Sequence, residues 1–145
     1  MEKENFSVKK KKGKEKMRKE LWICIFVILC IIIINMLVEN YTDYAVKLMD
    51  DKLDILEKSI KEDEINRKNV KDNLEEAINS WKNVYERLAY FIEHDELEKV
   101  ETELTELKAN IEQENYEEVV PNIEKGIFIL NHIREKFRLN LKNVF

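Results

Sequence analysis

The chain has 145 residues, of which 38% are charged and 44% hydrophobic, with only two glycines and one proline. So few turn-forming residues nearly exclude β-sandwiches, barrels and glycine-rich nucleotide loops, and they predict an all-α protein. The net charge of −5 combines three unlike segments. Residues 1–20 hold nine Lys or Arg against four Asp or Glu, residues 21–38 hold neither kind, and residues 39–145 hold sixteen against twenty-six.

Residues 21–38 read LWICIFVILCIIIINMLV, a run long enough for a transmembrane helix. Basic residues precede this run and acidic residues follow it, so the positive-inside rule predicts a cytoplasmic tail at 1–20 and an extracytoplasmic domain at 39–145. A cleaved signal peptide is the alternative. It is disfavoured because the best cut, after Ala45, puts Asp43 where a small residue is needed. The basic tail is explained by topology, so no nucleic-acid partner is expected.

From residue 46 to residue 91, apolar residues recur every three or four positions, which is the period of an α-helix. Asp63 and Arg67 interrupt this apolar seam, so the segment forms either one very long helix or two helices joined there. Residues on these and later apolar faces are predicted to form the core: Trp81, Leu88, Phe91, Leu104 and Leu130.

Asp95 is predicted to cap a third helix, and the chain is predicted to reverse direction near Glu114. Asn115 and Glu118 have the spacing of a weak capping box that opens a last helix. Pro121 is expected to kink that helix or to mark its true start. Gly126 is expected to cost helix stability and to permit close helix packing. The predicted fold is therefore an N-terminal transmembrane helix followed by an antiparallel bundle of about four helices in paired hairpins.

Three parts of the sequence carry a resemblance to a known family: Trp81, the run FIEHDELEKVETELTELK at 91–108, and the ending LNHIREKFRLNLKNVF at 130–145. From about residue 46, the chain resembles an uncharacterised family of small single-span membrane proteins of Gram-positive bacteria, annotated only as a domain of unknown function. The HDE run and the Lys-Asn-Val-Phe terminus are its most specific features. The resemblance implies a span followed by paired helices, favours two helices over one across 61–69, and implies no activity.

The outer segment offers little catalytic chemistry, since it has two serines, two histidines and no cysteine, and it lacks HExxH spacing. No enzyme activity and no cofactor are therefore expected. Antiparallel helices would bring the two histidines to one level of the bundle, with acidic residues beside them. This candidate contact or sensing layer comprises His94, Asp95, Glu96, His132 and Glu135. Each imidazole could instead cap a helix or anchor a buried hydrogen bond, and a divalent metal site and a proton-responsive contact both stay open.

The sequence thus predicts a single-pass protein of the cell membrane with its N-terminus in the cytoplasm. Its outer domain is expected to be a non-catalytic helical module that binds or steadies another membrane or envelope protein. The alternative is an extracytoplasmic sensor of pH or metal that uses the two-histidine layer. The lipid bilayer and one protein of unknown identity are the expected partners, and homo-oligomerisation stays open.

Overall fold

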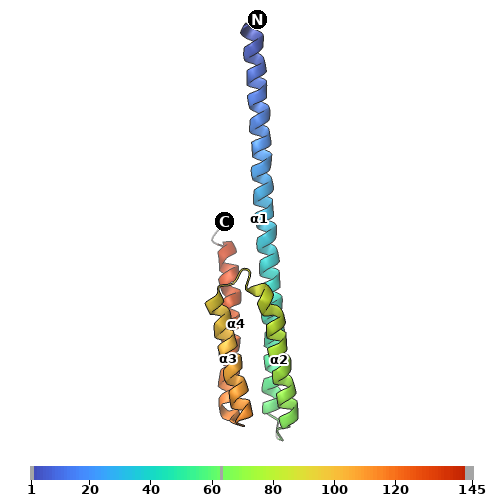
Figure 1. Ribbon diagram of the computed structural model, residues 1–145, viewed down its shortest axis with the longest axis vertical. Helices are drawn as coiled ribbons and strands as arrows, with labels where there is room; N and C mark the ends of the chain where they lie inside the picture. The colour runs from blue at the N-terminus through green and yellow to red at the C-terminus, as the bar shows by residue number, and fades with distance from the viewer. Residues whose placement is uncertain (1, 63, 143–145) are drawn as a thin grey trace. The chain divides into compact units, whose positions relative to one another are not determined.

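The computed structural model describes the backbone of residues 2–62 and 64–142, and the side chains of residues 18–62 and 64–138. The described residues form four helices and no strand, which confirms the all-α prediction (Figure 1). These helices are α1 at Glu2–Ile60, α2 at Arg67–Leu88, α3 at His94–Glu112 and α4 at Tyr116–Lys142. Two residue sets used in the sequence argument, Asp63 and the Asn143-Val144-Phe145 terminus, lie outside the described residues.

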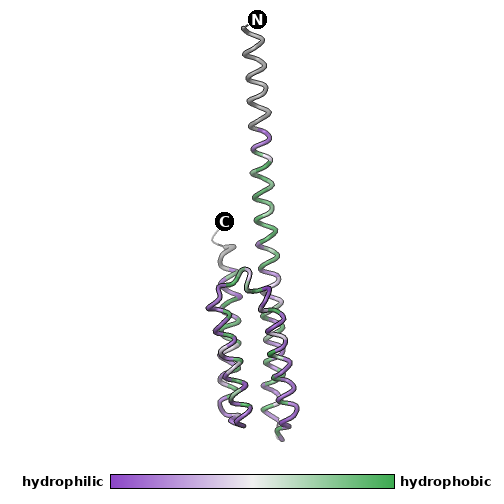
Figure 2. The backbone as a smooth tube through the Cα atoms, in the orientation of Figure 1, coloured by the Kyte–Doolittle hydropathy of each residue, from purple (hydrophilic) through white to green (hydrophobic). Residues whose placement is uncertain are grey.

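The chain divides into two compact units, residues 1–37 and 38–145, and α1 contributes to both. In the first unit, α1 carries a continuous hydrophobic stretch (Figure 2). Its large apolar side chains are uncovered, with Trp22 and Phe26 each 67% exposed. Among the described residues, α1 is the helix long and apolar enough to cross a membrane. Hydrocarbon solvates such a surface far better than water does.

The second unit is an antiparallel bundle made by residues 38–60 of α1 together with α2, α3 and α4 (Figure 1). Hydrophobic residues lie on the inner sides of these helices and hydrophilic residues lie outside (Figure 2). Every buried apolar residue of the described chain lies between Ala45 and Ile133. The bundle therefore has a core of its own. Of the predicted core residues, the following are buried: Trp81, Leu88, Leu104 and Leu130. Phe91 is half-buried and packs at the edge of the core.

The break between α1 and α2 confirms the two-helix alternative, since α1 ends at Ile60 and α2 begins at Arg67. Asn66 occupies the N-cap of α2 in an extended conformation. Its side-chain oxygen accepts hydrogen bonds from the backbone N–H groups of Lys68, at 3.1 Å, and Asn69, at 3.2 Å. These two donors have no partner inside the helix, so the cap fixes where α2 starts.

The predicted cap at Asp95 is wrong, because α3 begins at His94 with Glu93 in the N-cap position. Glu93 makes no side-chain cap hydrogen bond. Asp95 and Glu96 instead lie in the first turn, where negative charge interacts favourably with the helix dipole. The other end of α3 closes in a Schellman motif. Glu114 adopts a left-handed conformation (φ 59°), and the Asn115 N–H donates to the Asn110 carbonyl at 2.9 Å.

Helix α4 starts at Tyr116 and passes through Pro121, so a start at Pro121 is wrong. Proline removes one N–H donor from the helix, and in regular geometry the carbonyl of Glu117 loses its partner. Pro121 lies on the exposed side of α4, where water can satisfy that carbonyl. Val119 and Ile123 flank the proline and are fully buried, so packing on both sides of it holds the turn in helical form.

Gly126 is buried on α4, but it is not needed for close helix packing. A Cβ atom built there would lie 3.8 Å from Leu53 Cδ1 and 3.9 Å from Glu103 Cβ, which are ordinary van der Waals distances. The predicted close approach is therefore wrong, and alanine fits at this position.

The seam between α3 and α4 contains a polar cluster around Glu103, a carboxylate that is almost fully buried. Lys125 Nζ lies 2.6 Å from Glu103 Oε1. Asn122 Nδ2 donates to Glu106 Oε2 at 2.8 Å and to Glu103 Oε2 at 3.4 Å. A buried charge is tolerated when it is paired and hydrogen-bonded, and these contacts fix the register of the two helices.

Candidate contact site at the turn between α2 and α3

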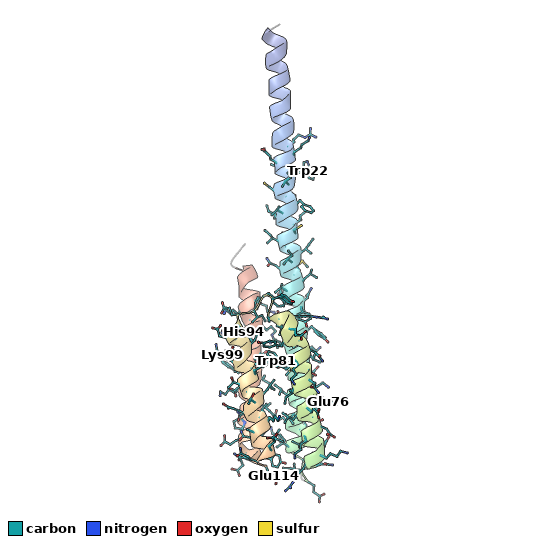
Figure 3. All side chains as sticks on the ribbon, in the orientation of Figure 1. Trp22, Glu76, Trp81, His94, Lys99 and Glu114 are labelled. Carbon is teal, nitrogen blue, oxygen red and sulfur yellow. The ribbon has the colours of Figure 1, made fainter. Side chains whose placement is uncertain are left out.

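The candidate site lies at the end of the bundle where α2 turns into α3, and Figure 3 shows His94 there with Glu114 at the opposite end. The turn is held against α1. Phe91 meets the Tyr41 ring edge-on at 6.3 Å, and the Arg87 guanidinium lies 5.8 Å from the same ring. Both contacts are of kinds that stabilise aromatic clusters. These contacts fix the turn at the end of the bundle where the α1 segment of the bundle begins, at residue 38.

A small hollow of about 140 Å3 opens beside the turn, between the start of α3 and the last turns of α4. Its lining residues are Phe91, Ile92, Glu93, Glu96, Ile133, Lys136 and Phe137. Lys136 Nζ lies 2.8 Å from Glu93 Oε2 and 3.7 Å from Glu96 Oε1. The hydrogen bond to Glu93 raises the pKa of Lys136 above its ordinary value, so the lysine stays charged. The hollow thus combines an apolar lining with a paired, charged rim.

His94 lies between two polar groups, Tyr85 and Glu98, and is largely exposed. Its Nδ1 is 3.3 Å from the Tyr85 hydroxyl, and its Nε2 is 3.5 Å from Glu98 Oε1. Partial burial, with the charges of Glu101 and Glu98 adding to it, raises the pKa of Tyr85. The phenol therefore stays protonated, and the direction of its hydrogen bond with Nδ1 depends on the tautomer of the ring.

The remaining members of the predicted layer are only partly brought together. Glu96 reaches α4 through Lys136, as the antiparallel geometry requires. His132 and Asp95 are exposed, and Glu135 pairs at 3.6 Å with Arg138, which also lies 3.7 Å from Asp43 of α1. In the described part of the chain, no hydrogen bond or ion pair joins the two histidines.

A metal site finds no support in the described side chains, because no group of three or more His, Cys, Asp or Glu residues among them is arranged to hold an ion. The arrangement presents charged and aromatic side chains at the surface of the bundle.

Two residues of this site were not predicted from the sequence. Lys136 could have been found by the same antiparallel alignment that pairs the two histidines, since it places α4 near residue 136 beside the start of α3. Tyr90 had no such signal. It is 88% exposed in the turn itself, and nothing in the periodicity separates an exposed turn aromatic from a core residue.

The family model described as Domain of unknown function (DUF4363) matches residues 36–144. No curated protein and no solved structure matches the chain.

Proposed function

Because the chain belongs to the DUF4363 family, whose function is unknown, we propose a function from the site itself. The protein is a membrane-anchored, non-catalytic helical module that binds or steadies another membrane or envelope protein. Residues 1–20 are cytoplasmic, residues 21–38 span the membrane, and the bundle lies outside the cell. As the sequence resemblance implies, its relatives are small single-span membrane proteins of Gram-positive bacteria.

The observation that carries this proposal is the exposure of Tyr90 in the α2–α3 turn, directly before Phe91, which lines the hollow. Tyrosine is enriched among the residues that dominate binding energy at protein interfaces. The hollow supplies an apolar pocket edged by Glu93, Glu96 and Lys136, which gives a partner both a place for a side chain and a charge pattern to match.

The position of the site supports a partner in or close to the membrane. The turn packs on Tyr41, which follows the proposed span by three residues along α1. Three helical residues rise by about 4.5 Å. Outer loops of a neighbouring membrane protein are therefore within reach of Tyr90 and His94.

Site-specific photo-crosslinking in intact cells tests the contact. A benzophenone amino acid at Tyr90 of the full chain should give a defined crosslinked product. The matched control is the same group at Ile65, which is exposed in the α1–α2 turn at the other end of the bundle. Tyr90→Ala should weaken partner binding about tenfold or more. Equal products from both positions, or none from either, would contradict the proposal.

Protease accessibility tests the topology separately. Protease added outside intact, wall-stripped cells should remove a tag placed after the bundle and spare one placed before residue 1. Protection of the C-terminal tag would overturn the orientation, and with it the extracytoplasmic partner.

A proton-responsive contact is the second candidate, and the surroundings of His94 favour it. Protonation of the ring would turn the Nε2 contact with Glu98 into an ion pair and leave Nδ1 able only to donate to Tyr85. Crosslinking yield at Tyr90 should then depend on pH. That dependence should vanish in His94→Gln. A yield independent of pH in the unmodified chain would rule this candidate out.

A further inference from the structure

A groove with an apolar floor runs between α2 and α3, away from the site at the turn. Two adjoining hollows of about 670 Å3 and 350 Å3 form it, and both are lined by Ile78, Lys82 and Lys108. The apolar side chains of the groove are Leu74, Ile78, Trp81, Leu104 and Ile111. An apolar cavity of about 150 Å3 accepts a benzene ring, so the larger hollow has room for an aromatic side chain.

A large aromatic side chain is exposed elsewhere on the same bundle. Phe128 is 72% exposed on the outer side of α4. Tyr90 and Phe128 are the two most exposed large hydrophobic residues in the described part of the bundle. Nothing in the described chain covers it. Phe128 lies on α4 and lines neither hollow of the groove, so the two do not meet within one copy.

The contacts between α3 and α4 place Phe128 at the level of the groove. Lys125 pairs with Glu103, and Lys136 pairs with Glu93. Phe128 follows Lys125 by three residues, and α3 runs antiparallel to α4, so Phe128 is level with Val100. The larger hollow is lined by α3 residues from Glu98 to Lys108, a range that includes this level.

We propose that Phe128 of one copy of this chain inserts into the α2–α3 groove of a second copy. If two copies are related by rotation about an axis parallel to the bundle helices, their helices point in the same direction. Equivalent residues then lie at the same height along that axis. Such a rotation brings Phe128 of one copy to the height of Ile78 and Trp81 of the next. The contact joins two different surfaces, so it is heterologous and closes into a ring or extends into a chain. This association is independent of the partner proposed for Tyr90.

One pair of charges across the two surfaces is complementary in this orientation, on a groove wall that carries Lys82 and Lys108 as well as Glu98, Glu101 and Glu106. Glu124 lies one turn from Phe128 toward the α3–α4 connection, the direction in which Lys108 lies on the groove wall. Among the described side chains, Glu124 makes no hydrogen bond or ion pair and interacts only at longer range with the charge of Lys61, and Lys108 has only a 3.9 Å contact with Glu112. Both are therefore available to a second copy.

Disulfide trapping of the full chain in its membrane tests the contact directly. The native thiols are first removed with Cys24→Ser and Cys30→Ser. One tagged copy carries Phe128→Cys, and a differently tagged copy carries Thr102→Cys in the groove. Oxidation should give a mixed product bearing both tags. Pairing Phe128→Cys with Glu76→Cys, an exposed α2 position that does not line the groove, should not. Equal trapping at position 76, no mixed product, or products joining position 102 to itself would overturn the proposal.

Association in vesicles gives a second test that does not need cysteines in the contact. Fluorescently labelled full chains in phosphatidylcholine vesicles should show energy transfer that Phe128→Glu abolishes, with unchanged helical circular dichroism because Phe128 is exposed. Glu124→Lys and Lys108→Glu should each reduce transfer in homogeneous samples. A chain carrying both changes should recover it. Transfer in the unmodified chain no greater than in Phe128→Glu would refute the contact and leave the groove to a different protein.

Discussion

Replacing Trp81 by alanine should remove a large part of the stability of the bundle. The indole is 2% exposed and packs edge-on against Tyr85 at 5.9 Å. Burying an aromatic ring of this size removes about 150–250 Å2 from water, and truncating one to alanine costs about 3–5 kcal/mol. A bundle of this size has only about 5–15 kcal/mol in total. Trp81→Ala should therefore lower the melting temperature of a fragment of residues 38–145 by about 12 °C or more.

The indole N–H refines this prediction, because Trp81 Nε1 is buried and has no hydrogen-bond partner among the described residues. An unsatisfied buried donor costs about 1–3 kcal/mol. Trp81→Phe removes that donor while it keeps most of the ring, so its cost should be far smaller than that of Trp81→Ala. Lys82→Ala, at the exposed neighbouring position, is the control and should leave stability nearly unchanged.

Urea unfolding followed by circular dichroism is the appropriate assay, since the fragment has no tryptophan other than Trp81 and its fluorescence is lost with the mutation. The midpoint should fall strongly for alanine and little for phenylalanine, with similar slopes. Equal midpoints for Trp81→Ala and the unmodified fragment would refute the burial argument. Trp81 would then have to be exposed in solution.

Three further changes test the packing and charges of the bundle. Gly126→Ala should stabilise it by about 0.5–1 kcal/mol, because the methyl group has room and glycine weakens a helix interior; a lower melting temperature would show that the helices approach more closely. Burial raises the pKa of Asp50, so the ionised carboxylate disfavours the folded state. The contribution of Asp50 to the free energy of unfolding is therefore largest below about pH 3.8, where the group is protonated in both states, and it falls as the pH rises through the pKa of the folded state. Asp50→Asn should thus have a higher melting temperature than the unmodified fragment at pH 7 but not below about pH 3.8. Asp51→Asn, at an exposed position, is the control and should show no such difference. A lower melting temperature for Asp50→Asn at pH 7 would contradict the prediction. Glu103→Ala should cost only about 1–2 kcal/mol in thermal unfolding, because Asn122 keeps its 2.8 Å hydrogen bond to Glu106 and the largely exposed Lys125 stays solvated, and a loss above about 4 kcal/mol would contradict this.

The helices could be predicted from the sequence because periodicity is a local signal. The repeat that contains Trp81 and Leu88 predicts one buried face, and both side chains are buried. Periodicity alone did not decide whether a helix breaks before Arg67. This residue falls at a position of the apolar face, as in a continuous helix, but its side chain is charged. The Asn66 cap, which decides the start of α2, was not read from the sequence.

The errors arose where tertiary packing overrides local preference. Pro121 disfavours a helix locally, but burial of Val119 and Ile123 on either side retains it. Gly126 suggested a close approach, and whether two helices touch at a glycine depends on the interhelical distance, which the sequence does not contain. The exposure of Tyr90 is of the same kind, because it depends on which way a five-residue turn presents its side chains.

The first and last helices of the bundle are neighbours, and this has a consequence for synthesis on the ribosome. Arg138 of α4 pairs with Asp43 of α1, and Gly126 lies beside Leu53. Val119, the first buried residue of α4, follows Ile60, the last of α1, by fifty-nine positions. At about 5–20 residues per second, translation takes roughly 3–12 s to cover that distance. The side of α1 that α4 covers stays open throughout this interval, so the growing chain is most prone to aggregation after α1 has emerged and before α4 closes over it.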